Sequence, residues 1–167
     1  MEIREASLPA DRPAIERLWL DYLVWVNDTM QARRGIHPHD PRQAVADDLA
    51  HIAKFLPPTG HLLLVEHDKR ACGIGCLRTI APGIGEIKRM YLEPAARGGG
   101  MGRALLQALV DAARVDGHTK VRLDSLDFMT DAHRLYRRLG FYDIPVYPES
   151  EIADAFQPYM VFMELAL

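Results

Sequence analysis

The sequence has no apolar run of the ~20 residues that a membrane-spanning helix needs. Its first residues, Met1 to Ala6, lack the apolar core of a secretory signal peptide. Basic excess is also missing, because 20 lysines and arginines face 23 aspartates and glutamates and give a net charge of -3. Nonspecific binding to nucleic acid requires such an excess. We therefore expect a cytoplasmic protein with neither a membrane nor a nucleic acid as its partner.

Cysteine is scarce, since only Cys72 and Cys76 occur. A four-residue offset on one strand places both side chains on one face, roughly 13 Å apart, which is too far for a disulfide. Neither cysteine has a second Cys/His pair at ligand spacing, so we interpret both as small apolar core residues. The segment His37-Pro38-His39-Asp40 is interpreted as a loop in which Asp40 caps a helix. No metal site is predicted.

What the sequence does contain is a series of strand-like and helix-like segments. The expected strands are Glu2–Ala6, His61–Glu66, Ala71–Ile80, Glu86–Leu92, Val121–Leu126, Phe141–Val146 and Tyr159–Leu165. The expected helices are one of roughly 15 residues capped by Asp11, one from Asp40 to Phe55, Met101–Val115 and Thr130–Leu139. This order predicts one α/β domain over residues 1–167, with a mixed, mostly antiparallel sheet of six or seven strands and about four helices.

The most informative segment is Arg97-Gly98-Gly99-Gly100-Met101-Gly102, which follows an apolar strand and opens a helix. Glycines let successive N–H groups face one point, and the N-terminus of the helix adds its positive dipole there. The spacing excludes a Rossmann GxGxxG motif and a Walker loop. A strand-to-helix turn of this kind predicts a binding site for a phosphate or pyrophosphate.

The spacing Arg97-x-x-Gly100-x-Gly102 resembles the pyrophosphate loop of the GNAT superfamily of acyl-CoA-dependent N-acetyltransferases. Two further segments resemble the family signatures, Tyr91-Leu92-Glu93-Pro94 upstream and Ala132-x-x-Leu135-Tyr136-x-x-Leu139-Gly140-Phe141 downstream. The resemblance covers roughly residues 86–141. It implies a GNAT-like fold, in which the strand that ends at Leu92 and the strand that begins near Val121 splay apart to admit acetyl-CoA, the co-substrate.

The resemblance also assigns residues to the site. Acetyl-CoA is expected to contact Met90, Tyr91, Leu92, Arg97, Gly98, Gly99, Gly100, Met101, Gly102, Arg103 and Met129. Within this set the amide of Leu92 matches the position that faces the thioester carbonyl. Tyr136 matches the tyrosine that protonates the departing thiolate, a role that suits its unperturbed pKa of ~10. Met129 stands where the family often has an asparagine that contacts the pantetheine arm.

The general base is left open among four alternatives. Glu86 resembles the glutamate of the histone-acetylating branch, and period-two alternation places Glu86, Lys88, Met90 and Leu92 on one side of the strand. Lys88 on the same face can neutralise this carboxylate. Asp124, Glu149 and an ordered water are the rivals of Glu86.

The acceptor is expected to be a primary amine, carried by a small molecule or a peptide. The resemblance assigns its binding to the first two helices and the segment before the final strand, which carry Trp19, Tyr22, Trp25, Asn27, Asp28, Tyr147, Glu149 and Tyr159. Of these, Trp19 and Tyr22 lie on an apolar helix stripe and are expected in the core.

The expected activity is direct attack of the amine on the thioester, because both cysteines lie outside the predicted site. The alternatives are a non-catalytic acyl-CoA sensor and a protein or peptide acetyltransferase. A homodimer would form through the final strand or the first helices.

Overall fold

Seven strands form one sheet in the computed structural model, which describes residues 1–167. They are β1 (Glu2–Glu5), β2 (Gly60–His67), β3 (Arg70–Ala81), β4 (Ile84–Leu92), β5 (Lys120–Leu126), β6 (Tyr142–Ile144) and β7 (Met160–Ala166). Their order is β1-β2-β3-β4-β5-β7-β6, and only β4 and β5 pair in parallel. The prediction of a mixed, mostly antiparallel α/β sheet is confirmed.

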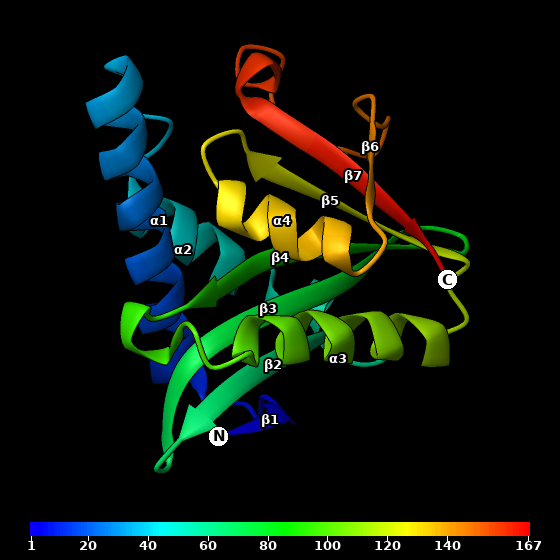
Figure 1. Ribbon diagram of the computed structural model, residues 1–167. Helices are drawn as coiled ribbons and strands as arrows, with labels where there is room; N and C mark the ends of the chain where they lie inside the picture. Colours follow the sequence, from blue (N-terminus) through cyan, green and yellow to red (C-terminus); the bar gives the residue numbers. More distant parts are fainter.

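Four helices cover the sheet, two on each face (Figure 1). They are α1 (Arg12–Arg34), α2 (Pro41–Ala50), α3 (Met101–Val115) and α4 (Thr130–Arg138). Side chains of α1 and α2 pack with one hydrophobic cluster, around Trp19 and Phe55, and side chains of α3 and α4 pack with a second, around Leu105 and Leu109. None of the helices is long and apolar enough to cross a membrane.

The first two helices differ from their predicted extents. Helix α1 has 23 residues and ends only at Gly35, which adopts a left-handed conformation with φ of 68°. Asp11 is the N-cap residue of this helix as predicted, but its side chain makes no capping hydrogen bond, because its carboxylate accepts from the backbone N–H of Ser7 and pairs with Arg4. Asp40 caps α2 as predicted. That helix stops at Ala50, and a separate 3-10 turn follows from Ile52 to Phe55.

A bulge in β3 places the two cysteines on opposite faces of the sheet. Val65 pairs with Gly73 and Glu66 pairs with Ala71, so Cys72 is an extra residue on its strand. Cys72 therefore packs in the cluster under α3, whereas Cys76 packs in the cluster under α1. The prediction that both cysteines share a face was wrong, although both are buried and free.

A second bulge, in β4, reverses the alternation that the sequence suggested. Lys88 pairs with Cys76 and Tyr91 with Ile74, so two residues of β4 face one residue of β3. Arg89, with φ of 54°, is at the bulge. Beyond it Met90 and Leu92 pack toward α3, the face to which Ile87 also contributes. Glu86 and Lys88 alternate with Ile87 and face the other way, so the prediction that Glu86, Lys88, Met90 and Leu92 share one side was wrong.

Candidate active site

The site lies where β4 and β5 separate. Their parallel pairing begins at Ile84 and Lys120 and ends at Ile87 and Leu123, and beyond that point the two strands diverge (Figure 1). The gap opens into a cavity of about 460 Å³, lined by residues 88–92 of β4, residues 123–125 of β5, and side chains from α1 and α4. The splay that the resemblance implied is therefore present.

The glycine loop forms one end of this cavity. Gly100 is the N-cap of α3 with φ of 82°, and Gly98 has φ of 86°. These left-handed conformations turn the backbone toward the first amides of the helix. Arg97, Gly98 and Gly102 line the main cavity, and Gly98, Gly100 and Gly102 also line an adjoining hollow with Arg103.

Two arginines of α4, Arg134 and Arg138, complete the adjoining hollow opposite Arg103. Asp131 also lines the hollow and pairs with Arg134. The N-terminal end of α3 and the guanidinium groups of Arg103 and Arg138 make this hollow suited to bind phosphate groups. Of the residues predicted to contact the cofactor here, Gly99 and Met101 line neither the cavity nor the hollow, and Met101 packs against the core under α3.

The end of β4 presents a backbone N–H to the gap. The N–H of Glu93 donates to the carbonyl of Cys72 on β3 at 2.9 Å. Because neighbouring residues of a strand point their N–H groups in opposite directions, the N–H of Leu92 points away from β3 and toward the gap. The carbonyl of Leu92 points the same way and accepts from Nε of Arg97 at 3.0 Å. Met90, Tyr91 and Leu92 all line the cavity.

Tyr136 of α4 lines the cavity with its hydroxyl unpaired. Its side chain is buried, and its ring packs on Phe141 with centroids 5.9 Å apart. The hydroxyl has no hydrogen-bond partner within the protein, and burial raises its pKa. Met129, which precedes α4, lines the same cavity and accepts a hydrogen bond from Ser125 at its sulfur.

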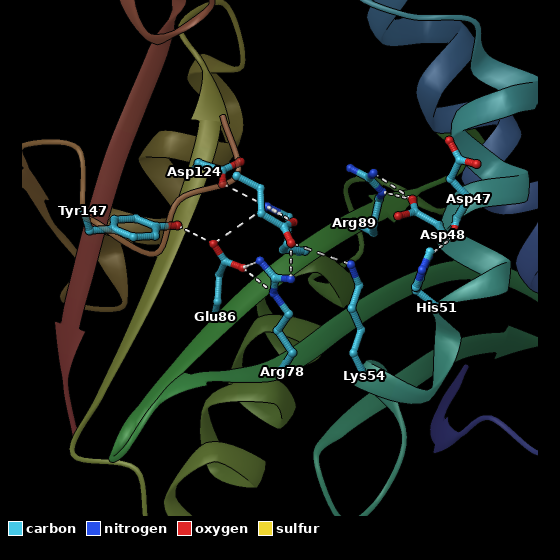
Figure 2. A network of polar contacts seen from close by, with 11 residues as sticks. Asp47, Asp48, His51, Lys54, Arg78, Glu86, Arg89, Asp124 and Tyr147 are labelled. Carbon is cyan, nitrogen blue, oxygen red and sulfur yellow. Dashed lines mark hydrogen bonds and ion pairs between the residues drawn. The ribbon is translucent and has the colours of Figure 1, made fainter. Parts of the chain in front are cut away.

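Glu86 is fully buried and does not line the cavity. Both Nε and Nη2 of Arg78 lie 2.6 Å from its Oε2, and the Tyr147 hydroxyl donates to its Oε1 at 2.6 Å (Figure 2). Lys88 Nζ lies 3.7 Å from the same Oε1. Both oxygens of this carboxylate therefore contact donors of the protein.

Asp124 of β5 lines the cavity directly. Its Oδ2 accepts from Lys88 Nζ at 3.1 Å, and its side chain is 12% exposed. Glu149, the third carboxylate considered as a base, pairs with Arg122 at 2.9 Å and lies outside the cavity. Of the three candidate carboxylates, Asp124 is the one that the fold brings to the splayed strands.

Aromatic rings line the other end of the cavity. Tyr22 and Trp25 of α1 and Phe128 of the loop before α4 lie there. The ring of Tyr91 lies between them and the glycine loop, 5.8 Å from the ring of Tyr22 and 5.7 Å from the guanidinium of Arg97. Trp19 is fully buried in the core, as predicted, whereas Tyr22 reaches the cavity wall.

The other residues considered for the acceptor lie elsewhere. The Tyr147 hydroxyl bonds to Glu86, the Asn27 side chain donates to the backbone of His39, and Tyr159 packs beneath the guanidinium of Arg34.

Sequence reasoning missed Phe128 and Arg89 as lining residues. Phe128 is an aromatic residue in the turn between a strand and a helix. Because such turns often carry binding residues, the order of strand and helix alone could have indicated that Phe128 lines a cavity. Arg89 left no such signal, because only the bulge directs its side chain toward α2, where it pairs with Asp48 at 2.7 Å.

Comparison with known proteins agrees with this geometry. The profile of the acetyltransferase (GNAT) family matches residues 16–141. An uncharacterized N-acetyltransferase of Schizosaccharomyces pombe is 33% identical over 129 residues, which cover 75% of this chain and 76% of that protein.

Two solved structures share the fold. PaiA N-acetyltransferase of Thermoplasma acidophilum, in complex with coenzyme A, superposes with a TM-score of 0.75 at 19% identity and covers 99% of this chain and 98% of its own. YncA of Salmonella typhimurium, solved with its cofactor acetyl-CoA, has a TM-score of 0.69 at 22% identity and covers 100% of this chain and 94% of its own. The family match over most of the chain and the sequence relative together show that this protein belongs to the GNAT family of acetyltransferases.

Proposed function

We propose that this protein, acting as one domain over residues 1–167, transfers the acetyl group of acetyl-CoA to the primary amine of a small molecule. The observation that carries the proposal is the cavity between β4 and β5, in which a backbone donor, a tyrosine hydroxyl and a carboxylate line one space beside the glycine loop. These are the groups that acyl transfer to an amine requires.

The glycine loop and the arginines around it suit the diphosphate and phosphate groups of acetyl-CoA. Amides of Gly100 to Arg103 at the start of α3 would bind the pyrophosphate, and Arg103 and Arg138 would add charge-assisted hydrogen bonds. The pantetheine arm would then run between the splayed strands past Met129. PaiA and YncA, which share the fold, were solved with coenzyme A and acetyl-CoA, and this likeness supports the same co-substrate here.

Three groups would carry out the transfer. Asp124 takes a proton from the ammonium of the acceptor, and the neutral nitrogen attacks the thioester carbon. The N–H of Leu92 stabilises the oxyanion that forms. As the new C–N bond forms, the nitrogen becomes positively charged and releases its second proton to solvent. The C–S bond then breaks, and the hydroxyl of Tyr136 gives its proton to the sulfur. Solvent restores the proton to the tyrosine and takes the proton that Asp124 holds. The products are an N-acetyl amide and the free thiol of coenzyme A.

Asp124 suits the role of base better than Glu86. A base must reach the proton that it removes, directly or through one water. Asp124 lines the cavity, and one of its oxygens is free of Lys88. Glu86 is enclosed by Arg78, Tyr147 and Lys88, so its role in this proposal is to hold β3, β4 and the segment before β7 together.

A small acceptor fits the wall of the cavity better than a protein chain. Tyr22, Trp25 and Phe128 stand together at the acceptor end, with Trp25 and Phe128 rings 5.7 Å apart in an edge-to-face contact. A peptide acceptor needs a groove that is open on both sides of the thioester. This aromatic wall blocks one of the two sides.

Two measurements test the proposal. Calorimetric titration should show acetyl-CoA binding, and release of free thiol should follow when small amines are added. Asp124→Asn should lower kcat by about 100-fold, the range expected for a lost general base, with acetyl-CoA binding unchanged. Glu149→Gln is the matched control, because it removes a carboxylate outside the cavity.

Absence of acetyl-CoA binding would overturn the proposal. Binding without thiol release from any amine or peptide would instead favour the acyl-CoA sensor. Full activity of Asp124→Asn would mean that Asp124 is not the base and that a water or another group removes the proton.

A further inference from the structure

We propose that the acceptor is an amine that carries both an aromatic ring and a carboxylate, and that Arg89 binds this carboxylate. The inference rests on the proposed function, because it concerns the acceptor end of the same cavity.

The aromatic wall is continuous from β4 to the loop before α4. Ring centroids of Tyr91 and Tyr22 lie 5.8 Å apart, those of Tyr22 and Trp25 6.3 Å apart, and those of Trp25 and Phe128 5.7 Å apart. All four residues line the cavity. Aromatic pairs at 4.5–7 Å are favourable, so a ring of the acceptor would extend the same series of contacts.

Arg89 faces this wall and has N–H donors that no group of the protein uses. Its Nε and Nη2 both lie 2.7 Å from Oδ2 of Asp48, and Nη1 makes no hydrogen bond or ion pair within the protein (Figure 2). The side chain is 23% exposed and lines the cavity. A guanidinium has five N–H donors, so a second carboxylate can bind to Arg89 while the pair with Asp48 persists.

The remaining charges at this end favour an anion over a second cation. The guanidinium of Arg33 lies 5.5 Å from the ring centroid of Phe128 and has no carboxylate partner. Lys88 already pairs with Asp124 and Glu86, and Arg34 already pairs with Asp127. A polyamine would place its distal ammonium group near Arg89 and Arg33, where like charges repel it.

The same charges would orient the acceptor. Asp124 attracts the ammonium group toward the thioester and repels a carboxylate. Arg89, displaced from β4 by the bulge toward α2, attracts the carboxylate away from the thioester. An acceptor with both groups is thereby bound with its nitrogen next to Asp124 and its carboxylate at Arg89.

The test compares matched acceptors at saturating acetyl-CoA with the full-length protein. Phenethylamine supplies the ring and the amine alone. Phenylalanine and 4-(2-aminoethyl)benzoic acid add a carboxylate at two different distances from the nitrogen. We expect kcat/KM for the better of the two carboxylated acceptors to exceed that for phenethylamine by about 10- to 100-fold, the range for a charge-assisted hydrogen bond.

Arg89→Gln should abolish this preference by raising KM for the carboxylated acceptor, while kcat/KM for phenethylamine stays within about threefold of wild type. Asp48→Asn is the control, because it removes the same ion pair and keeps the guanidinium. It should retain the preference, and Arg89→Lys should restore part of it. If Arg89 serves only to hold the bulge, Arg89→Gln and Asp48→Asn will lower turnover of both acceptors alike, which overturns the inference.

A lack of any preference for the carboxylated acceptors in the wild type overturns it as well. Calorimetric binding of the three acceptors to the enzyme loaded with coenzyme A gives a readout that needs no turnover. Binding of acetyl-CoA with no binding of a carboxylated acceptor overturns only the inference, whereas no binding of acetyl-CoA overturns the proposed function.

Discussion

Replacing Tyr136 by phenylalanine isolates one hydroxyl in the candidate active site. The ring packs on Phe141 with centroids 5.9 Å apart, and this contact survives the change. Because the hydroxyl has no partner within the protein, its removal leaves no buried group unpaired. We therefore expect the melting temperature of Tyr136→Phe to stay close to that of the wild type.

The effect on catalysis should be large by comparison. A tyrosine is protonated at neutral pH, and burial raises the pKa of Tyr136 further. The proton that the proposed mechanism needs is therefore present, although it is held more tightly than in an exposed tyrosine. General acids contribute about 100- to 10,000-fold, and the lower limit corresponds to about 2.7 kcal/mol of barrier. We expect kcat to fall by at least about 100-fold, while the Kd of acetyl-CoA changes less than about threefold.

Release of coenzyme A, followed with a thiol reagent, measures kcat, and calorimetry measures the Kd. Tyr142→Phe is the matched control, because it removes a tyrosine hydroxyl that bonds to Glu164 outside the cavity. A kcat of Tyr136→Phe within about threefold of the wild type would refute the reasoning. Tyr136 would then be a packing residue, and water would protonate the thiolate.

Three further changes test the loop, the buried charges and the pH response. Gly100→Ala forces a side chain into a left-handed conformation with φ of 82°, which should cost about 1–2 kcal/mol in thermal unfolding and weaken acetyl-CoA binding in calorimetry. Arg78→Met leaves a fully buried glutamate without its main charged partner and should lower the free energy of unfolding in urea by about 3–5 kcal/mol. Burial opposes charge on His61, but hydrogen bonds with Glu5 and Asp116 outweigh it and raise its pKa. Its stabilising effect is then complete below the unfolded pKa of ~6.5 and is lost as pH rises through the folded pKa, so the stability advantage over His61→Asn should shrink at alkaline pH.

The sequence predicted those elements best whose signals are local. The predicted helix Met101–Val115 has the bounds of α3, and Thr130–Leu139 differs from α4 by one residue. In both, glycine or turn residues precede a strongly amphipathic segment. Helix α1 runs well past its predicted end, because no glycine or proline occurs between Pro13 and Gly35 and the later turns bury Val26, Asn27 and Met30.

The site was predictable to the extent that it depends on the backbone and on one motif. The glycine loop follows from a glycine-rich turn between a strand and a helix, whereas the amide of Leu92 and Tyr136 follow from the resemblance. The acceptor end is different. Phe128 and Arg89 reach the cavity from a turn and from a bulge, and neither feature leaves a periodic pattern in the sequence.

The bulge at Arg89 explains why the choice of base needed the structure. Without it, alternation would have placed Glu86 on the same face as Leu92. One extra residue in β4 reverses the alternation of side chains at the end of the strand. Met90 and Leu92 therefore face α3, while Glu86 and Lys88 stay on the opposite face. Lys88 then reaches across to Asp124 on β5, the carboxylate that remains in the gap. A bulge depends on how β4 pairs with β3, a long-range property, so the residue that faces the acceptor is set by a contact that no local pattern encodes.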